Sequence, residues 1–288
     1  MSSVAPSGAF AATAAERAFF RLELAEARRS RWVAFTAVVY TLVFGGFVWL
    51  GLRESTVLGF TGISRVVLNV SNAVVLAVPL VALVATCQAI VKARSSGFFE
   101  LFLAQPCKRS DWLGAVVASR VLVVAGPIVV LFLAALAYGR VAGEASIAPL
   151  VARSLAVVVS LVIAFVGVGF LLSSIARTPE RATVYALLAW LAGSALHDFA
   201  LVGALLRARM PPAVVFALAA ANPVEAARLA ILSGVDPELS VLGPVGFWLA
   251  NTLGPRLTLA VGVAWPLAIG VVAIAVTARR LRRADLVG

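Results

Sequence analysis

The sequence has almost none of the residues from which nucleotide, metal and redox sites are built. A phosphate-binding loop needs a lysine followed by serine or threonine, and the only two lysines, Lys92 and Lys108, precede Ala93 and Arg109. The chain also has one histidine, two cysteines and two methionines, too few for a histidine–cysteine metal cluster or a thioether path for copper. We therefore expect no catalytic residues, no bound cofactor and no metal ligands on this chain.

Acidic residues are scarce as well, because 13 Asp and Glu stand against 24 Lys and Arg, for a formal net charge of +11. Such a charge can indicate nucleic-acid binding. Here the basic residues gather at the ends of apolar runs, as they do on the inner side of membrane proteins. We therefore expect contacts with membrane lipid and none with nucleic acid.

Apolar residues make up 62% of the chain and its mean hydropathy is +1.04, whereas a soluble domain has about 45–50%. Several runs exceed the roughly 20 residues that a helix needs to cross a bilayer. The sequence thus predicts an all-α polytopic membrane protein with six transmembrane helices in a domain of residues 32–278. The expected spans are 32–52, 66–91, 112–138, 147–175, 182–206 and 257–277.

The remaining segments are assigned by composition and charge. Residues 1–12 are expected to be a disordered tail, and residues 13–31 a basic amphipathic helix in the cytoplasmic interface. Residues 279–288 are expected to be a basic cytoplasmic tail. With the N-terminus inside, 15 of the 24 basic residues fall in cytoplasmic parts, 7 in outer parts and 2 within spans. This asymmetry predicts a multi-pass protein of the cell membrane with both termini in the cytoplasm.

Residues 92–111 form a short basic amphipathic segment between two apolar runs. Ser96 or Gly97 can cap a helix start, Glu100 suits the positive end of the helix dipole, and Pro106 ends the turn. The pattern predicts a short helix at the cytoplasmic face that fits a groove on a motor subunit, with Phe99 or Phe102 as its anchor. The candidate coupling residues are Phe98, Phe99, Glu100, Leu101, Phe102, Gln105 and Pro106.

Residues 211–235 lie between spans 5 and 6 and predict two short helices that are re-entrant or lie on the outer face. Asn222 can cap the second helix, Pro223 suits its first turn, and Glu225 can close a capping box. Glu225 and Arg228 share one helix face, so they can pair with each other or contact an outer partner. The following residues 241–255 contain glycine and proline and are expected to be a packed loop.

A few polar residues fall within the spans. Ionisable groups at membrane depth mark candidate sites, but polar side chains also fasten helices to one another. Arg120 and Arg153, near span ends, are expected to extend toward lipid headgroups. The candidate intramembrane polar site comprises Asn69, Asn72, Gln88, His197 and Asp198.

Three stretches carry a resemblance that covers nearly the whole chain. They are residues 58–65 (LGFTGISR) followed by 78–83 (VPLVAL), residues 97–109 (GFFELFLAQPCKR), and residues 222–230 (NPVEAARLA). Together they resemble the ABC-2 type permeases, and among them the permeases of exporters that serve nitrous-oxide-reductase maturation. Where that family carries two acidic residues ahead of the coupling helix, this chain has none.

The resemblance implies a type V exporter-like fold and a homodimer bound to two ABC ATPase subunits, which would carry ATP and Mg. It also implies a periplasmic accessory subunit and a role in copper-site maturation. The expected function is thus a permease subunit that is not itself an enzyme. Alternatives are an ion-coupled secondary transporter using His197 and Asp198, and a membrane scaffold without transport. Copurification of an ATPase subunit would separate the first from the others.

The charge asymmetry makes a direct prediction about topology. A cysteine in place of Ala284 should resist impermeant thiol reagents in intact cells and react after permeabilisation, because the basic C-terminus is expected inside. A cysteine in place of Ala145, between spans 3 and 4, should react in intact cells. Ready labelling at position 284 without permeabilisation would contradict the six-span topology.

Overall fold

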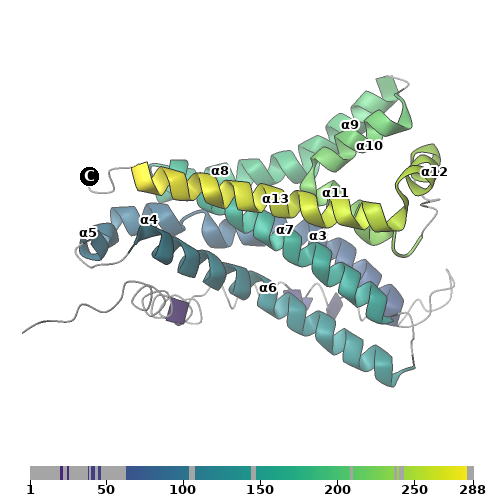
Figure 1. The fold of residues 1–288 in the computed structure, drawn as a ribbon, viewed down its shortest axis with the longest axis horizontal. Helices are drawn as coiled ribbons and strands as arrows, with labels where there is room; N and C mark the ends of the chain where they lie inside the picture. The colour runs from purple at the N-terminus through teal and green to yellow at the C-terminus, as the bar shows by residue number, and fades with distance from the viewer. Residues whose placement is uncertain are drawn as a thin grey trace, which may run out of the picture.

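The computed structural model describes residues 63–103, 108–143, 147–207, 210–236, 239 and 243–283, with a few isolated positions between 20 and 46. The expected tail, interfacial helix and first span therefore lie almost wholly outside the described residues, as does 284–288. Every regular element in the described part is a helix (Figure 1), which confirms the all-α prediction.

The described helices follow one another through short connections. In chain order they are α3 (Ile63–Thr86), α4 (Ala89–Ser95), α5 (Phe98–Leu103), α6 (Arg109–Val141), α7 (Ile147–Ile175), α8 (Pro179–Leu191), the π-helical turn η1 (Ala192–Leu196), α9 (His197–Arg207), α10 (Pro212–Ala221), α11 (Pro223–Leu232), α12 (Gly243–Thr252) and α13 (Gly254–Arg283). Figure 1 places α5 and the C-terminal end of α13 at one end of the bundle, here called the α5 end. It places α12 and the α9–α10 turn at the opposite end, the α12 end.

Five stretches of the described chain are long and apolar enough to cross a membrane, and they coincide with the expected spans 2 to 6. They are Asn69–Ser95, Arg109–Val141, Ile147–Ile175, Pro179–Ala204 and Gly254–Arg283. Between the last two, α10 and α11 meet at a bend of 116°. Each has 10 residues, hence a length of roughly 15 Å, so neither crosses alone. The prediction of two short helices between spans 5 and 6 is thus confirmed.

The expectation of a loop over residues 241–255 is wrong, because most of this segment is α12. Gly243 and Gly254 both have positive φ, at 58° and 69°, and each stands at the first residue of a helix. Pro244 and Pro255 follow them in the first turn, where proline suits a helix. The glycines and prolines therefore mark the starts of two helices. Phe216 of α10 packs against Trp248 of α12, with ring centroids 6.1 Å apart.

The bundle is built around α7, which packs against α13, α3, α6 and α11. Gly167 of α7 and Gly270 of α13 bring two backbones together, since a Cβ at position 167 would lie 2.6 Å from the Gly270 carbonyl oxygen. Nearer the start of α13, Gly262 allows an equally close approach to α11, because a Cβ there would lie 2.6 Å from the Ala226 carbonyl oxygen. Small residues at such contacts let membrane helices approach closely.

This contact predicts a stability difference between two glycines. Gly270→Ala should lower the free energy of unfolding by about 1–3 kcal/mol, the usual cost of overpacking, because its Cβ would lie 2.6 Å from the Ile163 carbonyl oxygen. Gly126→Ala on α6, where nothing lies within 4 Å of the added Cβ, should be neutral or slightly stabilising. Thermal unfolding in detergent checks both, and equal effects would contradict the close α7–α13 contact.

Candidate functional site

The corner between α4 and α5 turns on a glycine. Gly97 has φ 71°, a left-handed conformation that glycine adopts without steric cost, and its carbonyl accepts the Glu100 amide hydrogen at 3.1 Å. Ser96 does not cap α5, because its hydroxyl lies 3.3 Å from the Ala93 carbonyl oxygen and so closes α4. Of the two expected caps, the structure therefore uses Gly97.

Aromatic rings hold α5 against the first turn of α6. The Phe99 and Trp112 rings meet edge to face, with centroids 5.0 Å apart and planes at 80°. Phe98 lies against both, 5.7 Å from Phe99 and 5.8 Å from Trp112. Each such pair adds about 0.5–1.5 kcal/mol beyond the apolar area it buries. Trp112 was missing from the expected coupling residues, because its partners only become neighbours when the chain folds back at α5.

Phe99 is 1% exposed, so it cannot be the anchor that enters a groove on another protein. This part of the expectation is corrected, and Phe99 instead fixes α5 to its own chain. Phe98 is half-buried and Glu100 is exposed at the α5 end. Leu101 and Phe102 continue α5, while Gln105 and Pro106 lie outside the described residues. The exposed face of α5 that the structure describes therefore centres on Glu100.

Away from α5, the structure brings Asp198 of α9 close to the Glu225–Arg228 pair of α11. The Arg228 guanidinium lies 2.5 Å from the Glu225 carboxylate, and 3.8 Å from the carboxylate of Asp198 on α9. The expected pairing of Glu225 with Arg228 is therefore confirmed, while the capping box is not formed by this carboxylate. Glu225 is 14% exposed against 33% for Arg228, and both lie on α11, so the link between α11 and α9 is the contact of Arg228 with Asp198. His197, the neighbour of Asp198, has a buried Nε2 without a hydrogen-bond partner among the described residues.

Asn222 connects α11 to the π-helical turn. Its Oδ1 accepts the Val224 amide hydrogen at 2.9 Å, as expected of a helix cap, and its Nδ2 donates to the Gly193 carbonyl of η1. A π-helical turn interrupts the α-helical ladder and is frequent at functional sites. The bond from Asn222 satisfies a carbonyl in that turn and fixes span 5 at the level of His197.

Arg153 does not extend toward lipid headgroups, so the expectation for this residue is wrong. Its guanidinium donates to the carbonyl of Ala230 at 3.1 Å, to the Ser233 hydroxyl at 3.2 Å and to the carbonyl of Pro255 at 3.1 Å. It thus satisfies carbonyls at the end of α11 and joins α7 to α11 and α13. A side chain at Gly234 would occupy the same space. The sequence carried no signal of this role beyond the depth of Arg153 in its span.

Two polar residues of span 2, Ser71 and Gln88, fasten helices to one another. The Ser71 hydroxyl lies 2.8 Å from the Ser154 hydroxyl, which joins α3 to α7, and Gln88 donates to Thr183 of α8 at 2.7 Å. Asn69 and Gln88 are roughly 28 Å apart at the rise of an α-helix. The expected set of Asn69, Asn72, Gln88, His197 and Asp198 therefore cannot act as a single site. Among the described residues, no three His, Cys, Asp or Glu side chains are grouped so that they could hold a metal ion.

The aromatic contact predicts a local effect on α5. Phe99→Ala should remove about 3–5 kcal/mol of packing and should speed hydrogen exchange of the α5 amides, because the Phe99–Trp112 contact holds this short helix against α6. Phe199→Ala on α9 removes a ring that is 76% exposed and should leave that exchange unchanged. Hydrogen–deuterium exchange with mass spectrometry measures both, and unchanged protection of α5 in the first variant would contradict its anchoring role.

The contacts of Arg228 with Glu225 and Asp198 predict that exchanging the charges of Glu225 and Arg228 destabilises the protein. The variant Glu225→Arg with Arg228→Glu keeps the internal pair but places a carboxylate beside Asp198, so it should lower the melting temperature. Adding Asp198→Asn should recover most of that loss, which we expect to be at most about 1 kcal/mol for partly exposed charges. If the third substitution brings no recovery, the contact between Arg228 and Asp198 has no energetic weight.

Comparison with known proteins agrees with this architecture. Residues 17–286 match the family described as ABC-2 family transporter protein. A protein of Pseudomonas aeruginosa named probable ABC transporter permease protein NosY is 29% identical over 222 residues, which cover 75% of this chain and 81% of that protein. A protein of the same name from Stutzerimonas stutzeri is 26% identical over 251 residues, covering 85% and 89%. Because the family match extends over nearly the whole chain, this membrane protein belongs to the ABC-2 family of transporter permeases.

Proposed function

We propose that this chain is the membrane-spanning half of an ABC exporter and that separate ATPase subunits drive it by contacting α5. The observation that carries the proposal is the α4–α5 corner. It is a short helix at one end of the bundle, joined to span 2 by Gly97 and held against span 3 by Phe99 and Trp112. A helix fixed in this way moves with two spans at once, as a lever between a motor and a bundle requires.

Charge supports the side on which the motor binds. The α5 end carries Lys92, Arg94, Lys108 and the arginines of the last turn of α13, and the positive-inside pattern supports a cytoplasmic location for this end. An ATPase that draws on cytoplasmic ATP has to bind there. Glu100 is exposed on α5, and we propose it as a polar contact of the ATPase. Two copies of the chain, each with one ATPase, make the working unit.

The proposed cargo is inferred from the names of the similar proteins and from the sequence resemblance. The two similar proteins are named NosY, and the three sequence stretches that resemble maturation exporters include the coupling helix. We therefore propose export of a component for the copper site of nitrous-oxide reductase, with an accessory subunit at the opposite end of the bundle. Deleting the gene of this chain should leave that reductase without its copper-site absorption, and restoring the chain should bring the absorption back. A fully loaded reductase in the deletion strain would contradict this cargo and leave the ATPase coupling untouched.

Ion-coupled transport through His197 and Asp198 gains no support from the geometry. Asp198 contacts Arg228, whose nearer partner is Glu225, so the polar groups at this level fasten α9 to α11. The structure describes no chain of further ionisable groups leading from them across the bundle. A structural fastening accounts for these contacts, and we propose no second function.

Coupling through α5 is tested by charge reversal at its exposed face. Glu100→Arg should reduce the amount of ATPase that copurifies with the chain by at least fivefold, because it replaces a contact with a like-charge repulsion or an unpaired cation. Glu180→Arg provides a matched control, since Glu180 is also an exposed carboxylate at the α5 end but begins α8. The control should retain the ATPase. Equal retention by both variants, with wild-type melting temperatures, would contradict contact through this face of α5.

A further inference from the structure

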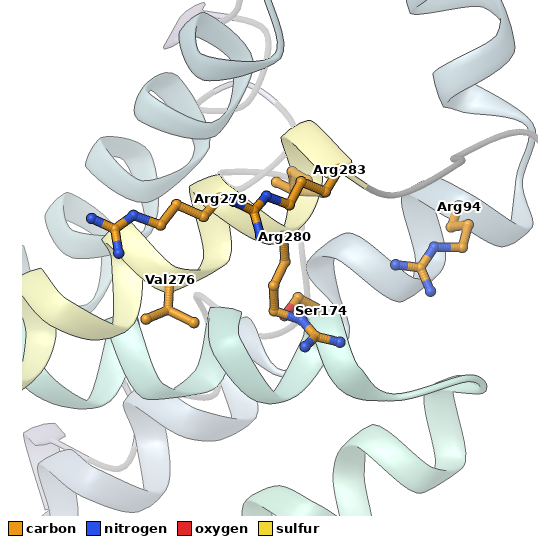
Figure 2. Close-up of a pocket in the computed structure, with 7 residues that line it drawn as sticks. Arg94, Ser174, Val276, Arg279, Arg280 and Arg283 are labelled. Carbon is orange, nitrogen blue, oxygen red and sulfur yellow. The ribbon is translucent and has the colours of Figure 1, made fainter.

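An open cavity of about 390 Å³ lies at the α5 end, between α4, the last turn of α7 and the last turns of α13. Figure 2 shows Arg280 reaching from α13 toward Ser174 of α7, and Arg94 approaching from α4 on the other side. The cavity is also lined by Arg279, Arg283 and Val276. Nothing in the proposed coupling through α5 uses these arginines.

The cavity gathers positive charge without compensation from the described part of the chain. Four of its lining residues are arginines, none of the described lining residues is acidic, and a guanidinium stays protonated in proteins. The Nε atom of Arg94 is buried and has no hydrogen-bond partner among the described residues. Like charges on neighbouring helices repel one another, so an anion bound among them would stabilise the arrangement.

Neighbouring contacts support the helices that carry these arginines. The Arg109 guanidinium at the start of α6 donates to the Leu281 carbonyl oxygen at 2.6 Å, which holds the last turn of α13 in place. The Ser174 hydroxyl donates to the Leu171 carbonyl oxygen at 2.7 Å, so Ser174 forms a wall and leaves ligand binding to the guanidinium groups. The cavity therefore offers a set of nitrogen donors on supported helices.

The guanidinium groups of the cavity and their position at the end of the last span indicate which class of ligand it binds. Guanidinium groups bind phosphate oxygens through paired hydrogen bonds, and basic pockets between membrane helices on the cytoplasmic side accept lipid headgroups. On α13 the arginines begin directly after the apolar stretch that ends at Ala278. With the proposed cytoplasmic location of the α5 end, the arginines stand where the last span leaves the apolar core, which is the level of the lipid headgroups.

We propose that this cavity binds the phosphate group of an anionic phospholipid of the inner leaflet. The bound lipid joins α4 to α13, and so connects the helix that leads into α5 with the last span. The site is separate from the exposed face of α5, and it would exist whether or not Glu100 contacts an ATPase.

The test compares lipid-induced stabilisation of the full-length chain in detergent. Phosphatidylglycerol should raise the melting temperature of the wild-type chain in a saturable way, while phosphatidylcholine and inorganic phosphate should raise it little. Arg94→Gln with Arg280→Gln should increase the phosphatidylglycerol concentration for half-maximal stabilisation at least tenfold. The matched control is Arg177→Gln with Arg282→Gln, which removes two exposed arginines that do not line the cavity and should keep the wild-type response.

Two results would overturn the proposal. Equal stabilisation of the cavity variant and the control variant would show that the lipid does not bind at these arginines. A cavity-dependent stabilisation by inorganic phosphate alone, equal to that by phosphatidylglycerol, would show a site for free phosphate instead of lipid. If the double variant does not purify folded, native mass spectrometry of Arg280→Gln against Arg282→Gln decides the question. The first should retain fewer phosphatidylglycerol molecules than the second, and equal retention would contradict the site.

Discussion

The rest of the bundle depends on the close approach of α7 and α13, whose backbones meet at Gly167 and Gly270. No other residue type fits there without moving one helix, because each added Cβ would lie within 3 Å of the opposite backbone. The contact leaves α7 in the centre, with α3 and α6 packed on it from other directions. It also decides what the two ends of α13 meet: α11 near its start, and α4 and α7 beside its last turns.

The charged residues at the two ends of the bundle have different surroundings, and this difference separates structural roles from binding roles. Arg153 donates to two carbonyls and a hydroxyl, and Arg228 contacts two carboxylates. Both are charges whose partners belong to the chain, as buried charges require. The arginines around the cavity at the α5 end have no acidic partner among the described lining residues. The proposed phospholipid phosphate would supply the anionic partner that the described lining residues do not.

Much of the fold could be predicted from the sequence, because span length and helix caps are local properties. The span 147–175 coincides with α7, and Asn222 with Pro223 marks the start of α11. The error at α12 has the same origin, since glycine and proline open a helix as readily as they make a loop, and local composition does not distinguish the two.

The roles of single side chains were harder to predict, because they depend on residues distant in sequence. The local sequence predicted Phe99 as a surface anchor, but in the fold its ring is buried against Trp112. Arg153 reaches residues 77 and 102 positions away, and no local pattern indicates such partners. The cavity likewise needs α4, α7 and α13 side by side. In the sequence, these arginines are basic residues near span ends. Most basic residues of the chain share that position, so it does not distinguish the arginines of the cavity.

We propose that an ATPase subunit binds the exposed face of α5. Photo-crosslinking in native membranes tests this most directly, with benzoylphenylalanine in place of Glu100 on α5 and, separately, in place of Phe247 on α12 at the far end of the bundle. Both side chains are exposed. We expect illumination to join a P-loop ATPase to the chain from position 100 and not from position 247. A crosslink to the ATPase from position 247 alone would contradict it.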